Sequence, residues 1–411
     1  MSDVPPTGIK ARPTSTRWLI VSITGLMSIV AGIDRADISI LAKPLIAGHY
    51  VTGPILGLAN SLFLVVFALS NGLGGMMVDR LGAKRILTAA ATWWGVVTAV
   101  TAFFFAGFAI VPLRVLLGLG EGLQGPTCSK WVKEWFPTKE RAVASTIQNA
   151  GLWVGPLISG PLVTWLYLTT GSVSVPWLVL GIGTIALAVP AVVFLGGDRP
   201  EEHRLANDAE TTLIREGQAV ERKLQIPAHR VLRDYHYWIV VFAWAGMATI
   251  FFGLTFWFPL YMEDVRHLSV QATGAWYAVP YILMLVFAIA SSLFSDRIVR
   301  RAPFIAIGPI LAAVLLLVAT HMTAVTPALL LISLGLACNG FVVPNISASL
   351  QQFAQPSNIG VVYGVALATQ TLASAIGTYI IGVSFDVGFI YMEAFAILGG
   401  LATVVLVVEG L

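Results

Sequence analysis

Two apolar stretches of this 411-residue chain contain ionisable side chains that could bind protons and anions. The first holds Asp34, Arg35 and Asp37, and the second holds Arg114 and Glu121. On a helix, two residues three apart share one face, and two residues seven apart lie along one stripe. A charge in apolar surroundings is costly, so we expect these five groups to pair with one another or to bind a ligand.

The five groups contain more acid than base. Pairing the two arginines with two carboxylates leaves a third carboxyl group without a counter-ion, and burial then favours its protonated form. Such a group is a candidate proton carrier, while the planar guanidinium group suits recognition of a carboxylate. The structural alternative is a permanent salt-bridge cluster. We expect no comparably buried charge in the other apolar segments.

The composition indicates that lipid surrounds these residues. The chain is 57% hydrophobic and 11% charged, whereas an average soluble domain is roughly 25% charged. Hydropathy predicts an all-α integral membrane protein with twelve transmembrane helices. The spans are expected near residues 18–44, 55–78, 86–106, 109–131, 142–168, 175–196, 236–262, 272–294, 304–322, 327–350, 359–384 and 388–408.

The positions of Lys and Arg predict the orientation. If twelve spans alternate, 20 of the 24 Lys and Arg residues fall on one side, which is then the cytoplasmic side. This predicts four parts, with both termini in the cytoplasm. They are a cytoplasmic tail (1–17), an amino-terminal six-helix bundle (18–196), a cytoplasmic central loop with a surface helix near 201–224 (197–235), and a carboxy-terminal six-helix bundle (236–408).

Each half carries an acidic-basic pair just after its second span. The pairs are Asp79-Arg80, followed by Lys84-Arg85, and Asp296-Arg297, followed by Arg300-Arg301. The first copy, read from Gly75, resembles the signature loop of the major facilitator superfamily, G-x-x-x-D-R-x-G-x-K/R-K/R. The resemblance implies the major facilitator fold, with two pseudo-symmetric six-helix bundles, and a gating role for this loop.

Span five contains a second motif of small residues and proline. Its Gly151-Leu-Trp-Val-Gly155-Pro156 resembles the Gly-Pro motif found at this position across the same superfamily. Small residues permit close helix packing, and proline kinks a helix. Tight packing and a hinge for gating at Gly155 and Pro156 are both consistent with the pattern.

Spans one and four point to one family within that superfamily. Gly32-Ile-Asp34-Arg35-Ala-Asp37-Ile-Ser39 and Arg114-Val-Leu-Leu-Gly118-Leu-Gly-Glu121 resemble stretches of the anion:cation symporter family, which includes galactonate, hexuronate and phthalate transporters. The resemblance implies that Asp34 and Glu121 are protonation sites. It also implies that Arg35 engages a substrate carboxylate and that Arg114 takes part in coupling. Whether Asp37 adds a third protonation site or neutralises Arg35 is left open.

The chain departs from this family at positions near the expected pocket. Gly32 stands where an aromatic residue is usual, Phe67 where a Tyr is common, and Leu152, beside Trp153, where sugar-acid transporters have Gln. These departures predict a less hydroxylated substrate, either aromatic or a short monocarboxylate. Further candidate lining residues, for which helix–helix hydrogen bonding or interfacial anchoring is the alternative, are Gln148, Trp153, Trp257, Tyr261, Asn345 and Gln370.

The sequence therefore favours a proton-coupled symporter of a small organic anion in the bacterial inner membrane. An anion exchanger or uniporter without proton coupling is the alternative. An enzyme is not expected, because the chain has no H-E-x-x-H metal motif, nucleophile elbow or phosphate loop. We expect no cofactor or metal, and no nucleic-acid partner, since the net charge is only +3. The expected unit is a functional monomer in the lipid bilayer.

Overall fold

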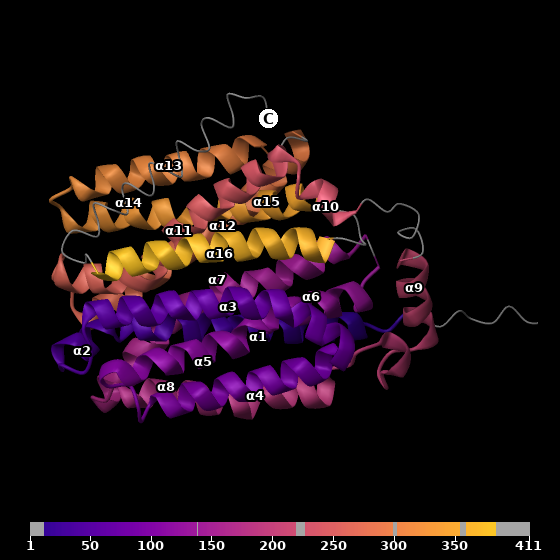
Figure 1. The fold of residues 1–411 in the computed structure, drawn as a ribbon, viewed down its shortest axis with the longest axis horizontal. Helices are drawn as coiled ribbons and strands as arrows, with labels where there is room; N and C mark the ends of the chain where they lie inside the picture. The colour runs from indigo at the N-terminus through magenta and orange to yellow at the C-terminus, as the bar shows by residue number, and fades with distance from the viewer. Residues whose placement is uncertain (1–11, 138, 219–226, 299–301, 354–358, 384–411) are drawn as a thin grey trace, which may run out of the picture.

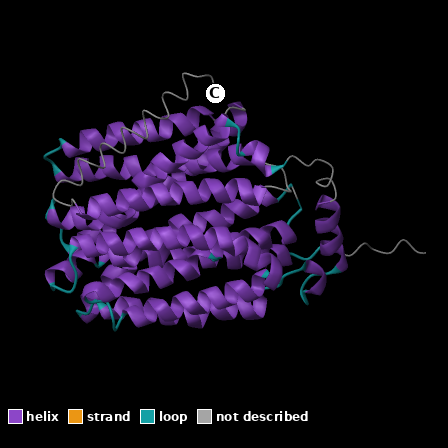
Figure 2. Ribbon diagram, in the orientation of Figure 1, coloured by secondary structure: helices purple, strands orange, loops and turns teal. Residues whose placement is uncertain are grey.

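The computed structural model describes residues 12–137, 139–218, 227–298, 302–353 and 359–383. This part of the chain is helical and contains no strand (Figure 1, Figure 2). The first helices are α1 (Thr16–Ile40), α2 (Ala42–Ala47), α3 (Gly53–Leu81), α4 (Ala83–Thr101), α5 (Ile110–Gly122), α6 (Gln124–Trp135), α7 (Arg141–Thr170) and α8 (Ser174–Gly183), which π-helical turns extend to Leu195. The others are α9 (Asp208–Gln218), α10 (Ala228–Val231), α11 (Tyr235–Asp264), α12 (Val270–Ile298), α13 (Ala302–Thr320), α14 (Val325–Ala337), α15 (Asn339–Phe353) and α16 (Ile359–Val383).

The long helices run side by side between two ends of the molecule (Figure 1). We call the end at which α9 lies the connector end, and the opposite end, at which α2 lies, the distal end. The amino-terminal half comprises α1–α8 and the carboxy-terminal half α11–α16.

Most of the predicted spans coincide with observed helices. Ten described segments are long and apolar enough to cross a membrane, and α4 coincides with the predicted third span. The predicted twelfth span, 388–408, lies outside the described residues. Large apolar side chains such as Phe103, Leu187 and Ile289 remain exposed on the bundle, as expected where lipid covers the surface.

Small residues bring α1 and α7 close together. A Cβ atom on Gly155 would lie 2.6 Å from the Cα atom of Gly32, and one on Gly151 would lie 2.6 Å from the carbonyl oxygen of Gly25. Larger residues at these positions would push the helices apart. The Gly-Pro motif is therefore a helix crossing, and its role as a hinge stays a prediction.

The two halves meet toward the distal end. The Ser61 hydroxyl in α3 donates a hydrogen bond to the carbonyl oxygen of Ala375 in α16 at 2.8 Å. α7 crosses α12 where a Cβ atom on Gly160 would lie 2.6 Å from the carbonyl oxygen of Gly274. α2 also packs against α11. These contacts join the halves on the side away from the connector.

The connector, which is the segment between the end of the α8 extension and the start of α11, is fixed to the amino-terminal half through α9. The buried carboxylate of Glu210 in α9 accepts hydrogen bonds from the backbone N–H groups of Thr16 and Arg17, at 3.2 and 3.1 Å, and from the Arg17 guanidinium at 3.0 Å. It thereby satisfies N–H groups that the start of α1 leaves unpaired. α9 begins later than the expected residue 201, because the Asn207 side chain caps it by accepting from the Glu210 N–H at 2.9 Å.

Candidate functional site

The charged groups of the first span face those of α5. Arg35 Nε donates a hydrogen bond to Glu121 Oε2 at 2.6 Å. The Glu121 side chain is 0% exposed and that of Arg35 is 10% exposed. Such a pair is shielded from water, so removing either partner would leave an uncompensated buried charge.

A second ion pair lies beside the first. Arg114 Nη2 donates to Asp37 Oδ1 at 2.9 Å, and its Nη1 donates to the backbone carbonyl oxygen of Asp34 at 3.3 Å. Asp37 is therefore the partner of Arg114 and does not neutralise Arg35, which was one of the two roles left open for it.

Asp34 is the acid that is left over. Both of its carboxyl oxygens are buried and have no hydrogen-bond partner, and Arg35 Nη2 and Glu121 Oε1 are buried without a partner as well. The two ion pairs thus account for both arginines and leave one carboxyl group without a counter-ion. An ionised carboxylate without a partner is costly at such a position.

The aromatic ring of Phe67 covers one side of Arg35. Its guanidinium carbon lies 4.6 Å from the centroid of the Phe67 ring, which stacks on Phe63 at 5.9 Å. A guanidinium group over an aromatic face gains a cation–π interaction. With Nε bound to Glu121 and one face covered by Phe67, Arg35 has its Nη2 group available for a ligand.

Glycines determine how closely the charged helices approach. A Cβ atom on Gly118 would lie 2.6 Å from the carbonyl oxygen of Phe63, so α3 fills the space beside this stripe of α5. A Cβ atom on Gly32 would lie 2.9 Å from Pro156 Cδ. Neither glycine therefore opens room for a substrate.

The carboxy-terminal half contributes hydroxyl groups that the sequence analysis missed. Tyr277 OH donates to the carbonyl oxygen of Thr255 at 3.0 Å, and Tyr281 OH donates to Tyr277 OH at 3.1 Å. The Thr255 hydroxyl lies 3.0 Å from Tyr281 OH. The available signal was the pair of tyrosines four residues apart in an apolar span, since buried tyrosines usually have a hydrogen-bond partner.

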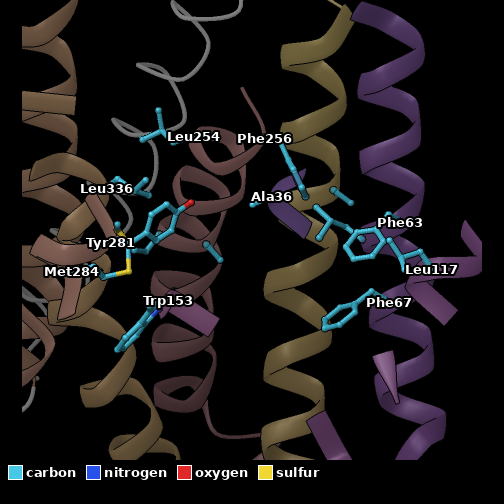
Figure 3. Close-up of a cluster of buried hydrophobic side chains, with 14 of the residues drawn as sticks. Ala36, Phe63, Phe67, Leu117, Trp153, Leu254, Phe256, Tyr281, Met284 and Leu336 are labelled. Carbon is cyan, nitrogen blue, oxygen red and sulfur yellow. The ribbon is translucent and has the colours of Figure 1, made fainter. Parts of the chain in front are cut away.

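The other predicted lining residues are buried but dispersed. The cluster in Figure 3 has Trp153 near Met284 and Tyr281 in one part, and Phe63 and Phe67 in another. Gln148 is also buried. Trp257 packs where α3 meets α16, since a Cβ atom on Gly382 would lie 2.9 Å from its ring.

Three predicted lining residues are engaged within the carboxy-terminal half. The Tyr261 hydroxyl accepts a hydrogen bond from Arg266 Nε at 2.7 Å. Asn345 donates to the carbonyl oxygen of Phe341 at 2.8 Å, and Gln370 donates to the Thr371 hydroxyl at 2.7 Å. Each of these three side chains therefore has a partner in its own half, and their substrate-binding role stays a prediction.

The predicted gating loop lies at the connector end. Asp79 pairs with Lys130 of α6 at 2.9 Å, and Arg80 and Arg85 are exposed. The backbone N–H of Lys84 donates to Asp198 Oδ1 at 2.7 Å. These contacts stay within the amino-terminal half and the start of the connector, so the gating role remains a prediction.

One buried acid contradicts the expectation that deep charges are confined to spans one and four. Glu263, in the last turn of α11, is 1% exposed, and neither of its carboxyl oxygens has a hydrogen-bond partner. The sequence placed it just beyond the seventh span. α11 instead continues to Asp264 and packs against α2, which buries this carboxyl group.

Comparison with known proteins identifies the fold and the family. The family model of the Major Facilitator Superfamily matches residues 24–378. The chain belongs to this superfamily. The inward-open xylose transporter XylE from E. coli has a similar structure, with a TM-score of 0.75, 16% sequence identity and coverage of 94% of this chain and 95% of that one. This confirms the predicted major facilitator fold.

Curated relatives in this superfamily are transporters. The hexuronate transporter of Bacillus subtilis is 28% identical over 395 residues, which cover 92% of this chain and 90% of that protein. A probable chloroplastic anion transporter of Oryza sativa subsp. japonica, anion transporter 3, is 26% identical over 398 residues, covering 91% of this chain and 75% of that protein. The chain is therefore a multi-pass membrane transporter and not an enzyme.

Proposed function

We propose that this major facilitator protein carries a small organic anion together with protons, by alternating access to a site between α1 and α5. Arg35 and Arg114 provide anion binding and coupling, and Asp34 and Glu121 are the protonation sites. The names of the curated relatives, a hexuronate transporter and an anion transporter, support an anionic substrate.

The single observation that carries the proposal is the carboxyl group of Asp34. It is buried beside two arginine–carboxylate pairs, and both of its oxygens lack a partner. A group in this position is held neutral by burial and ionises only when the local charge changes. A static cluster of two ion pairs would have no need of a third acid.

Charge counting suggests how substrate and protons are linked. Two arginines and three ionised carboxylates give the cluster a net charge of −1, which becomes 0 when Asp34 is protonated and +1 when Glu121 is protonated as well. A monoanion then balances the cluster. Protonation of Glu121 also releases Arg35 Nε, so that the guanidinium group can bind a substrate carboxylate with two donors.

The orientation, together with the membrane potential, favours uptake. The concentration of Lys and Arg in the tail, the connector and the loops of that end favours a cytoplasmic connector end. The distal end, where the halves meet, then faces outward, as in an inward-facing carrier of the bacterial inner membrane with cytoplasmic termini. Two protons with one monoanion move one net positive charge inward, which gains about 2.3 kcal/mol per 100 mV.

The decisive experiment is uptake into proteoliposomes by the purified monomer, with a panel of carboxylates and with or without an imposed pH gradient. Accumulation of one carboxylate above its outside concentration, only when the outside is acidic, is the expected result. Uptake that depends only on a counter-anion inside would identify an exchanger. Equilibration without accumulation would identify a uniporter, and either result would refute proton coupling.

A further inference from the structure

The distal end of the bundle holds another buried acid whose carboxyl group, like that of Asp34, has no hydrogen-bond partner. The proposed transport reaction does not use it. Glu263 is 1% exposed and its two carboxyl oxygens have no hydrogen-bond partner. Thr273 of α12 lies beside it, and its buried hydroxyl group acts on this carboxyl group. The described charged groups that act on this carboxyl group are Lys43 from α2 and Asp264 from its own helix.

Lys43 connects the two halves at this place. Its ammonium group donates to the backbone carbonyl oxygen of Glu263 at 2.8 Å and pairs with the Asp264 carboxylate at 3.2 Å. The lysine belongs to the amino-terminal half and both acids to the carboxy-terminal half. The side chains of Lys43 and Asp264 are more than a third exposed, so this ion pair lies at the rim, while Glu263 lies beneath it.

We propose that Glu263 is a proton-binding site of a distal gate, which is the contact of α2 with α11 at the distal end. The protonated form of Glu263 holds this end of the transporter closed. In the closed arrangement the carboxyl group is shielded from water, and the nearest ammonium group is already bound to a carbonyl oxygen and to Asp264. Shielding from water and the like charge of Asp264 favour the neutral form.

Opening the gate reverses this balance. When α2 separates from α11, water reaches Glu263 and the ionised form becomes favourable. Proton binding and closure are therefore linked, because the closed state binds the proton more tightly than the open state does. Acid on the distal side favours closure, and rising pH favours opening. This linkage needs only movement of the two halves, and it does not depend on proton coupling at Asp34 or Glu121.

A thiol at the contact between α3 and α16, which also joins the two halves toward the distal end, reports the opening of that end. Ser61→Cys places a cysteine at the buried contact between α3 and α16, and Thr323→Cys places one in the exposed turn between α13 and α14. The ratio of their maleimide labelling rates in nanodiscs cancels the effect of pH on thiol reactivity. Both native cysteines, Cys128 and Cys338, are buried, and labelling of the chain without an added cysteine is subtracted.

The labelling ratio is expected to rise at least about fivefold from about pH 5 to about pH 8, a typical coupling between two linked sites. Glu263→Gln, which imitates the protonated acid, should keep the ratio low at every pH. Asp264→Asn removes the like charge beside Glu263 and releases Lys43, so it should move the rise to lower pH, whereas only Glu263→Gln should abolish the rise. A rise in Glu263→Gln equal to that of the parent would overturn the proposal.

The same measurement in the Asp34→Asn, Glu121→Gln double variant separates this proposal from the proposed function. With Glu263 intact, the rise with pH should persist in that background, even where proton-driven uptake is lost. Loss of the rise there would assign the pH response to the central site and refute a role for Glu263. This arm keeps the proposal testable if Glu263→Gln does not fold.

Discussion

The buried ionisable groups of α1 and α5 contrast with the buried amide side chains of α15 and α16. Around α1 and α5, Asp34, Arg35 and Glu121 leave buried polar atoms without partners. In α15 and α16, Asn345 and Gln370 are bound to groups of their own helix. Unsatisfied buried groups are costly and await a ligand or a proton, whereas satisfied groups stabilise packing.

This difference assigns separate tasks to the two halves. In the proposed mechanism, the amino-terminal half holds the groups whose charge changes during transport. The carboxy-terminal half holds a hydroxyl cluster, in which Thr255, Tyr277 and Tyr281 are joined by hydrogen bonds. Among the described acids of the carboxy-terminal half, Glu263 is the one that is buried without a partner, and it lies at the distal end, away from the two central ion pairs. Substitutions in the two halves should therefore have effects of very different size.

The largest effect is expected at Arg35. Arg35→Ala removes the guanidinium group that is available for a substrate carboxylate and leaves Glu121 without its partner, which costs about 3–5 kcal/mol for a buried pair. Uptake and the thermal shift caused by substrate should both be lost. Arg35→Lys is the matched control, since it keeps the charge and loses the planar fork. An unchanged substrate-induced thermal shift in Arg35→Ala would exclude the anion-binding role.

The next effect in size concerns Glu121 and Asp34. Glu121→Gln and Asp34→Asn each fix one site in a neutral form, so accumulation driven by a pH gradient should disappear while exchange of substrate across the membrane persists. Parallel assays of accumulation and counterflow in proteoliposomes check this split. Asp37→Asn is a useful comparison, since it breaks the pair with Arg114 without removing either proposed proton site. Full-rate accumulation by Glu121→Gln would show that it is not a coupling site.

The sequence predicts much of the fold because hydropathy and loop charge depend on local composition. It also predicts that five charges gather between two spans. It does not predict that Asp37 pairs with Arg114, that α3 fills the space beside Gly118, or that Gly32 meets Pro156. These facts depend on where two helices cross, and a crossing is determined by the shapes of both surfaces.

The burial of Glu263 shows the same limit at a helix end. Glu263 lies one residue beyond the predicted seventh span, 236–262. α11 runs to Asp264, and α2, which follows the first span, lies against this end of the helix. No pattern in a single stretch of sequence indicates that contact. Boundaries of helices and contacts between distant segments were thus the parts that the sequence could not supply.

A smaller effect is expected in the hydroxyl cluster of the carboxy-terminal half. Tyr281→Phe removes a hydroxyl group that bonds to Tyr277 and Thr255, so the apparent melting temperature should fall by the equivalent of about 1 kcal/mol. Uptake should change less than about threefold, because this hydroxyl group already has partners within the cluster. Tyr277→Phe tests the other end of the same network. A large loss of substrate binding in Tyr281→Phe would place this tyrosine in the binding site and erase the contrast between the halves.

The smallest effect is expected in the connector, at Glu201 and Arg215. The hydrogen bonds and charge of Arg215 hold the pKa of Glu201 below its ordinary value. The contribution of the pair to stability is therefore complete above the ordinary pKa and is lost as the pH falls through the lowered one. Both side chains are about two-fifths exposed, 39% and 40%, so solvent screening limits the pair to a few tenths of a kcal/mol, about the lower end of exposed pairs.

Glu201→Gln should accordingly leave the apparent melting temperature nearly unchanged near neutral pH, and the small difference from the parent chain should vanish in acid. Glu210→Gln is the matched comparison in the same connector, because Glu210 is buried and binds the start of α1. Its substitution should cost about 1–3 kcal/mol, the range for a buried group that loses its partner. Equal destabilisation by the two substitutions would mean that α9 is held by its exposed pair. The connector would then be attached less firmly to the amino-terminal half than the contacts of Glu210 indicate.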